Sequence, residues 1–464
     1  MKRGITLLVC LLLLSISVSA NSGPAYWEQA PSFSMTALKD CPVTVEREDL
    51  TFDFQSGAQR SDYSPKAEVT AAYQMKNPAK AALSVQMAFP LISSLSDLAS
   101  AAGVRITADE KNVPFRVLLG GTAAEAGMTR NYYREDGTLN GQNLPSFEQI
   151  LQSIQAAPEA NKKLKDAGKL YQFSAMNQIQ PCRLLISFEI KPGKTNLIST
   201  GFNGYSSDAG KMELTGWLEP DRQAPLSFLV VGDDIQNLSV KAYGDNEKEL
   251  PGVKAEVKAS AQEVKPFFES IVKRSEAYRA FQSPEFLTQL YNAAAQHIDG
   301  LMAGGQTVID DSTFYDFYSK NRILILAYEI PFAAGSIAKV SVHYSMSGAM
   351  DAKTAAKPVY SYGYLLNPAK GWAGFNNLNI SVIPPKESPY VAKSSIPMTR
   401  GDSGIYSAKL DSLPKSDLTF TLYAKPQITP DGDFLRMILY ASACVVIAAA
   451  AFIIYRKRKK KSIA

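Results

Sequence analysis

The chain of 464 residues contains only two histidines and four cysteines, and this scarcity removes the usual ways of activating a nucleophile or holding a metal ion. Neither His297 nor His343 has a cysteine or a second histidine at the spacing of a zinc site. The sequence also lacks the G-x-S-x-G nucleophile motif and the alternating oxygen ligands of a calcium loop. We therefore predict no catalytic residue, no metal site and no cofactor, and we expect a protein that is not an enzyme.

Acidic residues leave one catalytic alternative open. Adjacent carboxylates occur at Asp109-Glu110, Asp233-Asp234 and Asp310-Asp311, and solvated turns explain them most simply. A glycan hydrolase needs two carboxylates at a defined separation, which a sequence does not reveal. An extracellular hydrolase that uses a carboxylate pair is thus the alternative to a non-catalytic protein.

An excess of basic charge is missing from most of the chain. The formal net charge is +5, but nine of the 49 Lys and Arg lie near the two ends, at Lys2, Arg3, Arg436 and the six positions 456–461. The other 40 are set against all 44 Asp and Glu, which gives the rest of the chain a net charge of about −4. Nucleic-acid binding needs a basic face interleaved with aromatic residues, so we expect no nucleic-acid partner.

Long hydrophobic runs are confined to the two ends. The run at 437–455 would form a helix of about 28 Å, close to the thickness of a bilayer core of about 30 Å. Six cations follow it directly, which favours a cytoplasmic C-terminus. We therefore predict a single transmembrane helix, with the lipid bilayer as its partner and the N-terminal domain extracytoplasmic.

The N-terminal run has the features of a secretory signal peptide. Lys2 and Arg3 precede an apolar stretch, and the small residues before position 21 suit cleavage after Ala20. We divide the chain into a signal peptide (1–20), a lead-in (21–65), a first β domain (66–250), a second β domain (251–428), a stalk (429–436), the membrane helix (437–455) and a basic tail (456–464).

Only two cysteines lie between the predicted signal peptide and the membrane helix. An extracytoplasmic location permits a disulfide between Cys41 and Cys182, with two buried free thiols as the alternative.

Apolar residues alternate along most of the central sequence, which predicts antiparallel strands. The segment 66–91 alternates on both sides of Asn77-Pro78 and is typical of a hairpin with one buried face. Helical periodicity appears at 146–158 and at 261–302, where Ser283 and Pro284 suit a helix start. The predicted fold is mainly β, with two tandem antiparallel β-sandwich-like domains, each carrying a helical insertion, and one C-terminal transmembrane helix.

An internal repeat suggests that the two domains are related, with coincidental strand patterning as the alternative. LLISFEI at 184–190 matches LILAYEI at 324–330, and PSFEQIL at 145–151 matches SPEFLTQL at 283–290 with nearly the same interval. Two further matches follow in order: GWLEP at 216–220 with GYLLNP at 363–368, and NLSV at 237–240 with NISV at 379–382.

A family resemblance rests on NPAKAALSVQMAFPL, VPFRV and KVSVHYSM and on their order. Together they resemble extracytoplasmic β-sandwich modules of uncharacterised bacterial membrane-anchored surface proteins. The order is also similar to the β-domain that precedes the von Willebrand-type domain in inter-α-trypsin inhibitor heavy chains, although no DxSxS metal-binding module is recognisable here. The resemblance implies a fold and no activity.

One aromatic cluster is a candidate binding patch. Tyr360, Tyr362 and Tyr364 alternate along a predicted strand and Trp372 follows, so their rings would share one face that binds a sugar or a protein, or else packs in the core. We expect a binding or scaffolding protein of the cell envelope whose partner is an unidentified envelope protein or glycan. An accessory subunit of a sensor or transporter is a further alternative.

Overall fold

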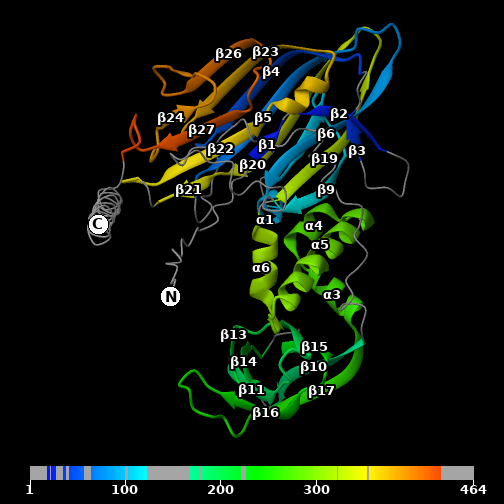
Figure 1. Cartoon of the computed structure of the whole chain (residues 1–464), viewed down its shortest axis with the longest axis vertical. Helices are drawn as coiled ribbons and strands as arrows, with labels where there is room; N and C mark the ends of the chain where they lie inside the picture. The colour runs from blue at the N-terminus through cyan, green and yellow to red at the C-terminus, as the bar shows by residue number, and fades with distance from the viewer. Residues whose placement is uncertain are drawn as a thin grey trace, which may run out of the picture.

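The computed structural model describes residues 18–20, 22–27, 35–37, 41–56, 64–99, 103–122, 167–176, 180–220, 226–320, 322–352 and 355–429. These residues lie mainly in β-strands. They form a large β-sandwich, a layer of helices and a smaller β lobe, stacked along the long axis of the molecule (Figure 1). The predicted mainly β class is therefore confirmed, whereas the arrangement of the strands differs from the prediction.

The first sheet of the sandwich has ten strands. Its central path runs β24 (Tyr390–Ser394), β27 (Leu418–Tyr423), β22 (Val359–Leu365), β1 (Val18–Ala20), β6 (Leu83–Ser93), β19 (Arg322–Phe332) and β9 (Phe115–Thr122). Three short strands join this path at its sides: β2 (Gly23–Trp27), β3 (Met35–Ala37) and β21 (Ala349–Asp351).

The second sheet of the sandwich has eight strands and carries the candidate site described below. Their order is β25 (Thr399–Arg400), β26 (Tyr406–Ser412), β23 (Gly374–Ile383), β4 (Thr44–Asp53), β5 (Lys66–Lys76), β20 (Ile337–Ser347), β7 (Arg105–Ala108) and β8 (Lys111–Asn112). All neighbours pair antiparallel except β4 and β23, which are parallel.

Aromatic side chains from both sheets fill the space between them. Phe52 of the eight-stranded sheet meets Tyr364 and Phe420 of the ten-stranded sheet edge to face, with ring centroids 5.9 and 5.1 Å apart. Phe89 and Tyr344 make the same kind of contact across the core at 5.5 Å. Each such pair adds about 0.5 to 1.5 kcal/mol to the burial of the rings themselves, so this layer is a main source of the sandwich's stability.

The smaller lobe is built from two further sheets. The five-stranded sheet runs β17 (Lys254–Glu263), β10 (Ala167–Met176), β15 (Leu226–Gly232), β12 (Thr195–Thr200) and β18 (Val308–Ile309). The four-stranded sheet runs β13 (Gly204–Asp208), β14 (Lys211–Leu218), β11 (Cys182–Glu189) and β16 (Gln236–Tyr243). Between the two sheets lies a core of Phe173, Phe188, Phe228 and their neighbours.

A helical layer joins the lobe to the sandwich. It consists of α3 (Val264–Lys273), α4 (Glu276–Phe281), α5 (Pro284–Ala303) and α6 (Asp311–Ser319). The predicted start of α5 is confirmed: Ser283 is its N-cap and accepts a hydrogen bond from the backbone N–H of Phe286 at 3.0 Å, with Pro284 in the first turn. The Gln289 side chain reaches the sandwich, where its Oε1 accepts from the backbone N–H of Leu119 at 3.0 Å.

The strands at 66–91 were predicted correctly, but the hairpin was not. β5 and β6 lie in opposite sheets, because β5 pairs with β20 and β6 pairs with β19. The buried faces of β5 and β6 therefore face each other across the core. Asn77 is fully buried at the crossing and holds it, because its Nδ2 donates to the backbone oxygens of Ala81 and Ala333 at 2.9 and 3.0 Å. Segments 77–82 and 333–336 thus form two adjacent β-arches.

The two predicted tandem domains are wrong at the 250/251 boundary. Strands on either side of that boundary pair with each other throughout the sandwich, and residues between β9 and β19 form an insertion. Thr122, the last residue of β9, is the register partner of Arg322, the first residue of β19. The chain therefore leaves the sandwich and returns to it at neighbouring points.

The proposed repeat does not match the strand arrangement. In the lobe, the strands containing 184–190, 216–220 and 237–240 (β11, β14 and β16) are neighbours in one sheet. Their counterparts β19, β22 and β23 are not neighbours and belong to both sheets of the sandwich. Coincidental strand patterning, the alternative, explains the matches; residues 145–151 lie outside the described residues.

The structure describes only part of the two end regions for which predictions were made. Among the described residues no helix is long and apolar enough to cross a membrane, and residues 437–455 lie outside them. The predicted lead-in, residues 21–65, contains the three strands β2, β3 and β4, and β4 lies in the middle of the eight-stranded sheet. The last residues of the predicted signal peptide form β1, which pairs with β22 and β6. Cleavage after Ala20 would remove this strand.

Candidate functional site: a polar face on the eight-stranded sheet

The outward side chains of the eight-stranded sheet form a polar surface, here called the polar sheet face. Because side chains alternate along a strand, Leu50 and Phe52 point into the core while Asp49 and Thr51 point outward. The strand register places the outward residues in rows that cross the sheet. One row contains Ser407, Ser381, Thr51, Thr70, His343 and Arg105.

A second row of the polar sheet face lies two residues along each strand. It contains Lys409, Asn379, Asp49, Ala72, Ser341 and Thr107. Most members of both rows are short hydroxyl or amide residues, so the surface presents hydrogen-bonding groups about 4.8 Å apart from strand to strand.

His343 is the centre of a small polar cluster on this face. Its Nδ1 lies 3.1 Å from the Thr70 Oγ1 and its Nε2 lies 3.2 Å from the Glu68 Oε2. Ser345 Oγ donates to the other oxygen of Glu68 at 2.8 Å. His343 is half-buried and points outward, since Val342 and Tyr344 on either side of it are buried. Sequence reasoning missed Glu68, Thr70 and Ser345, which only the strand register brings together.

The cluster has a hydroxyl, an imidazole and a carboxylate in contact, yet its surroundings suit recognition better than nucleophilic catalysis. At His343 the strand β20 pairs with β5 on one side and β7 on the other. The backbone N–H groups there belong to the sheet ladder and are not arranged as an oxyanion hole. Thr70 and Glu68 engage the two ring nitrogens and fix the imidazole orientation, while Ser345 holds the Glu68 carboxylate in place.

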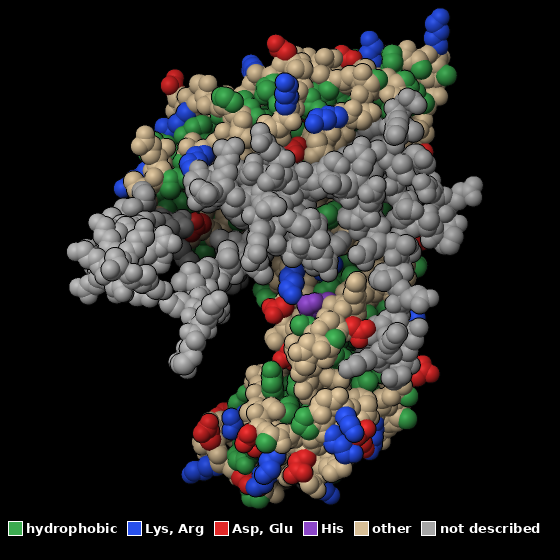
Figure 2. Space-filling model, viewed as in Figure 1, with side chains coloured by type: hydrophobic (Ala, Val, Ile, Leu, Met, Phe, Trp, Pro, Cys, Tyr) green, Lys and Arg blue, Asp and Glu red, His purple; other side chains and the backbone are tan. Residues whose placement is uncertain are grey.

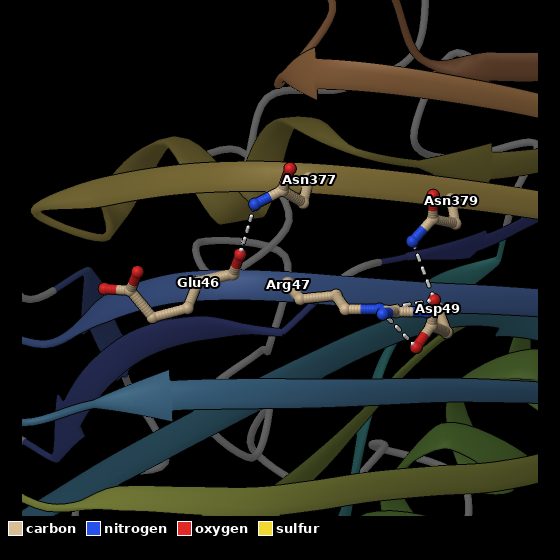
Figure 3. A network of polar contacts seen from close by, with 5 residues as sticks. All are labelled: Glu46, Arg47, Asp49, Asn377 and Asn379. Atoms are coloured by element: carbon tan, nitrogen blue, oxygen red, sulfur yellow. Dashed lines mark hydrogen bonds and ion pairs between the residues drawn. The ribbon is translucent and has the colours of Figure 1, made fainter.

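One end of the polar sheet face is held by a network across β4 and β23 (Figure 3). Arg47 Nε donates to both oxygens of Asp49 at 2.9 and 2.8 Å, and Asn379 Nδ2 donates to Asp49 Oδ1 at 2.8 Å. Asn377 Nδ2 donates to the backbone oxygen of Glu46 at 3.0 Å. A β-bulge between Val45 and Arg47 interrupts the alternation here, and the network holds the two parallel strands together across it.

Two carboxylates, those of Asp53 and Glu68, belong to register partners on β4 and β5. Asp53 Oδ1 accepts from the backbone N–H groups of Gln55 and Ser56 at 2.8 and 3.1 Å, while Glu68 is engaged by Ser345 and His343. Both therefore have structural partners. Within the described residues, no group of three or more His, Cys, Asp or Glu side chains is placed to hold a metal ion.

The predicted aromatic patch lies largely inside the sandwich. Tyr362 and Tyr364 are fully buried, Trp372 is 6% exposed and Tyr360 is half-buried, so these rings do not form an exposed binding surface. The core alternative describes them, because the face of β22 that carries Tyr362 and Tyr364 looks toward the eight-stranded sheet.

Tyr364 and Trp372 take part in a buried polar network around Ser22. Trp372 Nε1 donates to the backbone oxygen of Ser22 at 2.9 Å, and Ser22 Oγ lies 2.6 Å from the Tyr328 hydroxyl. The Tyr73 hydroxyl lies between Ser22 N at 3.5 Å and the Tyr364 hydroxyl at 3.4 Å, and Tyr364 donates to Glu48 Oε1 at 3.3 Å. Burial raises the pKa of the Tyr73, Tyr328 and Tyr364 hydroxyls, so each keeps its proton for hydrogen bonding.

The candidate disulfide between Cys41 and Cys182 is not formed. Both are buried free thiols, Cys41 in the core of the sandwich and Cys182 in the core of the lobe. The helical layer separates these cores (Figure 1). The alternative of two buried thiols is therefore correct.

Two pockets lie away from the polar sheet face. One of about 270 Å³ is bordered by β6, β9 and β19, with Gln86, Arg116 and Glu329 in its lining. Another of about 360 Å³ lies where the helical layer meets the lobe, and its polar groups are engaged within the protein. There Arg274 donates to Thr200 Oγ1 at 3.4 Å, and Asp311 accepts from the backbone N–H of Gly201 at 2.7 Å.

Comparisons with known proteins add little to this geometry. No protein-family model and no curated protein sequence matches the chain. Among solved structures, the chain is similar to the crystal structure of a putative nutrient binding protein from Legionella pneumophila subsp. pneumophila strain Philadelphia 1. The identity is 8% and the TM-score 0.32, with 88% of this chain and 72% of that chain covered. A likeness of that size carries no argument about function, and the resemblance to bacterial surface-protein modules stays a prediction.

Proposed function

We propose that this chain is a non-catalytic binding or scaffolding protein of the cell envelope. Residues 437–455 anchor it in the membrane, residues 21–436 are extracytoplasmic, and the polar sheet face contacts an envelope protein or glycan. The observation that carries the proposal is the row of short hydrogen-bonding side chains that crosses six paired strands. A paired sheet is a rigid support, and groups on strands are held more accurately than groups on loops.

The distribution of charge supports a protein or glycan partner. In the view of Figure 2, Lys and Arg are interspersed with Asp and Glu over the lobe rather than gathered into one basic field. The polar sheet face is similarly mixed, with Lys409 and Arg105 at its borders and Asp49 and Glu68 within it. A surface of mixed sign recognises by hydrogen bonds and shape more than by net charge.

A hydrolase is less well supported by the same face. A carboxylate pair that cleaves glycans needs one proton donor and one base or nucleophile aimed at the substrate. Asp53 and Glu68 are instead engaged by backbone N–H groups, a serine and a histidine. These contacts hold the carboxylates as parts of the face.

Site-specific photocrosslinking in cells tests the proposal directly. A photoreactive amino acid at Thr51, in the middle of the row, should give a defined adduct in the full-length chain. The same amino acid at Lys241, on β16 of the lobe, should not. Protease sensitivity of the adduct would identify a protein partner, and sensitivity to glycan-degrading enzymes would identify a glycan.

Two substitutions make the test specific. Ser381→Arg places a long cation beside Thr51 and should abolish the adduct, whereas Ser239→Arg, at an exposed position on β16, should leave it unchanged. If photoreactive groups at Thr51, Ser341 and Ser381 all fail to give an adduct at normal protein abundance, the polar sheet face is not a binding surface.

The membrane orientation has its own test. Protease added to intact cells should cleave within residues 21–436, and an antibody to residues 456–464 should bind only after permeabilisation. Binding of that antibody to intact cells would show that the proposed orientation is wrong.

A further inference from the structure

β17 is the most exposed long strand edge of the described sheets. It is the terminal strand of the five-stranded sheet, pairs with β10 over all ten of its residues, and is longer than the terminal strand of any other described sheet. Seven of its ten residues are exposed and the other three are half-buried. In Figure 1 it runs along the outer side of the lobe toward α3. Its outer edge therefore offers backbone groups to an added strand.

The sequence of this edge is complementary to itself in one antiparallel register. When Val257 lies opposite Val257 of a second copy, Glu256 lies opposite Lys258 and Lys258 opposite Glu256. Lys254 then lies opposite Ser260, and Ala255 opposite Ala259. Directly opposed residues of an antiparallel pair point to the same face, so the two Glu–Lys contacts form on one side of the joined sheet.

Neighbouring registers are disfavoured by the same charges. A shift of two residues in one direction places Lys258 opposite Lys258, and a shift in the other direction places Glu256 opposite Glu256. Parallel pairing in register would place every charge opposite its like. Within the part of the chain that the structure describes, Lys254, Glu256 and Lys258 make no ion pair, so their charges are available to a partner.

An exposed apolar residue lies at the centre of this register. Val257 is 40% exposed, although its register partner on β10, Phe173, is buried in the lobe core. In the antiparallel pair it would meet its own copy on the two-fold axis and be covered there. A symmetric contact of this kind closes after two copies and does not propagate into a fibre.

We propose that β17 is a homodimer interface, at which two copies of this chain pair antiparallel about Val257 and join their five-stranded sheets into one. The charges of Glu256 and Lys258 select a second copy over other strands, because an unrelated edge would leave them opposite unsuitable partners. The interface lies on the lobe, whereas the polar sheet face lies on the sandwich, so one dimer would present two such faces.

Charge reversal in the full-length chain tests the register. By symmetry, Glu256→Lys creates two Lys–Lys contacts and Lys258→Glu creates two Glu–Glu contacts, so each should weaken the dimer on the order of tenfold in sedimentation equilibrium. The double variant Glu256→Lys with Lys258→Glu restores both pairs and should restore the dimer. A structural effect on folding would not be rescued in this way.

Disulfide trapping locates the contact. Opposed Cα atoms in an antiparallel pair are about 4.5 to 5.5 Å apart, within the range that a disulfide spans. Val257→Cys should therefore give a covalent dimer on mild oxidation, above the background of the wild-type chain and of Tyr205→Cys, which places a thiol on the exposed terminal strand β13. Equal association of all charge variants, or trapping no greater than in Tyr205→Cys, would overturn the proposal. A Val257→Cys crosslink to a different protein would overturn it as well.

Discussion

Replacing Tyr328 with Phe removes one hydroxyl from the buried network and takes from Ser22 Oγ the partner that lies 2.6 Å away. Ser22 is fully buried and Tyr328 is 5% exposed, so water does not easily replace the missing group. Leaving a buried polar atom without a partner costs about 1 to 3 kcal/mol. Ser22→Ala should reduce the free energy of unfolding by a similar amount, because it leaves the buried Tyr328 hydroxyl without its hydrogen-bond partner.

The double variant distinguishes this bond from general packing. With both oxygens removed, no partner is left unsatisfied, so the cost should fall below the sum of the two single costs by about 1 to 3 kcal/mol. Urea unfolding of the full-length chain followed by tryptophan fluorescence measures it. A Trp217→Phe background removes the tryptophan of β14 in the lobe, so that the two that remain, Trp27 of β2 and Trp372, which contacts Ser22, report on the sandwich.

Tyr406→Phe is the matched control. Tyr406 is 8% exposed and lies in the sandwich, and its hydroxyl makes no hydrogen bond to a described residue, so the substitution should change the free energy of unfolding by less than about 0.5 kcal/mol. Single costs of that size at Ser22 and Tyr328, or exact additivity in the double variant, would refute the network as a source of stability.

Three further predictions follow from burial. Burial raises the pKa of the Asp417 carboxyl, although the carboxylate accepts hydrogen bonds from the backbone N–H groups of residues 366 and 367. Its contribution to stability is therefore fully present below the unfolded pKa of about 3.9. That contribution is lost as the pH rises through the higher pKa of the folded state. In unfolding measurements over that pH range, the wild type should therefore lose stability relative to Asp417→Asn. If the free energies of unfolding of the two proteins change with pH by the same amount, the prediction is wrong. Cys41 and Cys182, whose pKa values are also raised by burial, should react with a maleimide only after denaturation, and unreduced peptides should show no bond between them. Mass spectrometry of the mature N-terminus should find Asn21, which keeps Ser22 in place; a start beyond Ser22 would dismantle the network.

The alternation of buried and outward residues along the strands could be predicted from the sequence, whereas the strands with which they pair could not. Alternation at 66–91 marks one buried face on each of two strands, and both faces are buried as predicted. Two strands in one sheet and two strands in facing sheets produce the same alternation. The choice is made by Asn77, whose hydrogen bonds to the second arch depend on residues more than 250 positions away.

β4 shows why the sequence did not reveal a strand at the centre of the eight-stranded sheet. Val45, Leu50 and Phe52 are buried, but Glu48 occupies an inward position and the bulge after Val45 shifts the alternation by one residue. A charged residue in the core is rare enough to argue against a buried strand. The sequence 44–53 therefore resembles a polar lead-in, although it forms the centre of the sheet that carries the polar sheet face.

The polar sheet face was beyond sequence reasoning for a related reason. Ser, Thr and Asn at alternate positions describe any solvated strand, and only the register across six strands turns them into a continuous surface. The aromatic residues that the sequence singled out are instead core residues, since large rings gain most from burial. His343 was visible in the sequence only as an isolated histidine, because its neighbours Glu68 and Thr70 are more than 270 residues away along the chain.

The position of the insertion explains why the chain looked like two domains in tandem. Thr122 and Arg322 are register partners, so the ends of the inserted segment are as close as neighbouring strands, and closing the sandwich around it requires no long connection. Strands therefore occur before, within and after the inserted segment, as they would along two separate domains in tandem. The pairing of β6 with β19 and of β5 with β20 requires both halves to be present before the sandwich core can close. Contacts of such long range form slowly, and the inserted lobe, whose strands pair across shorter separations in the sequence, has the topology to form first.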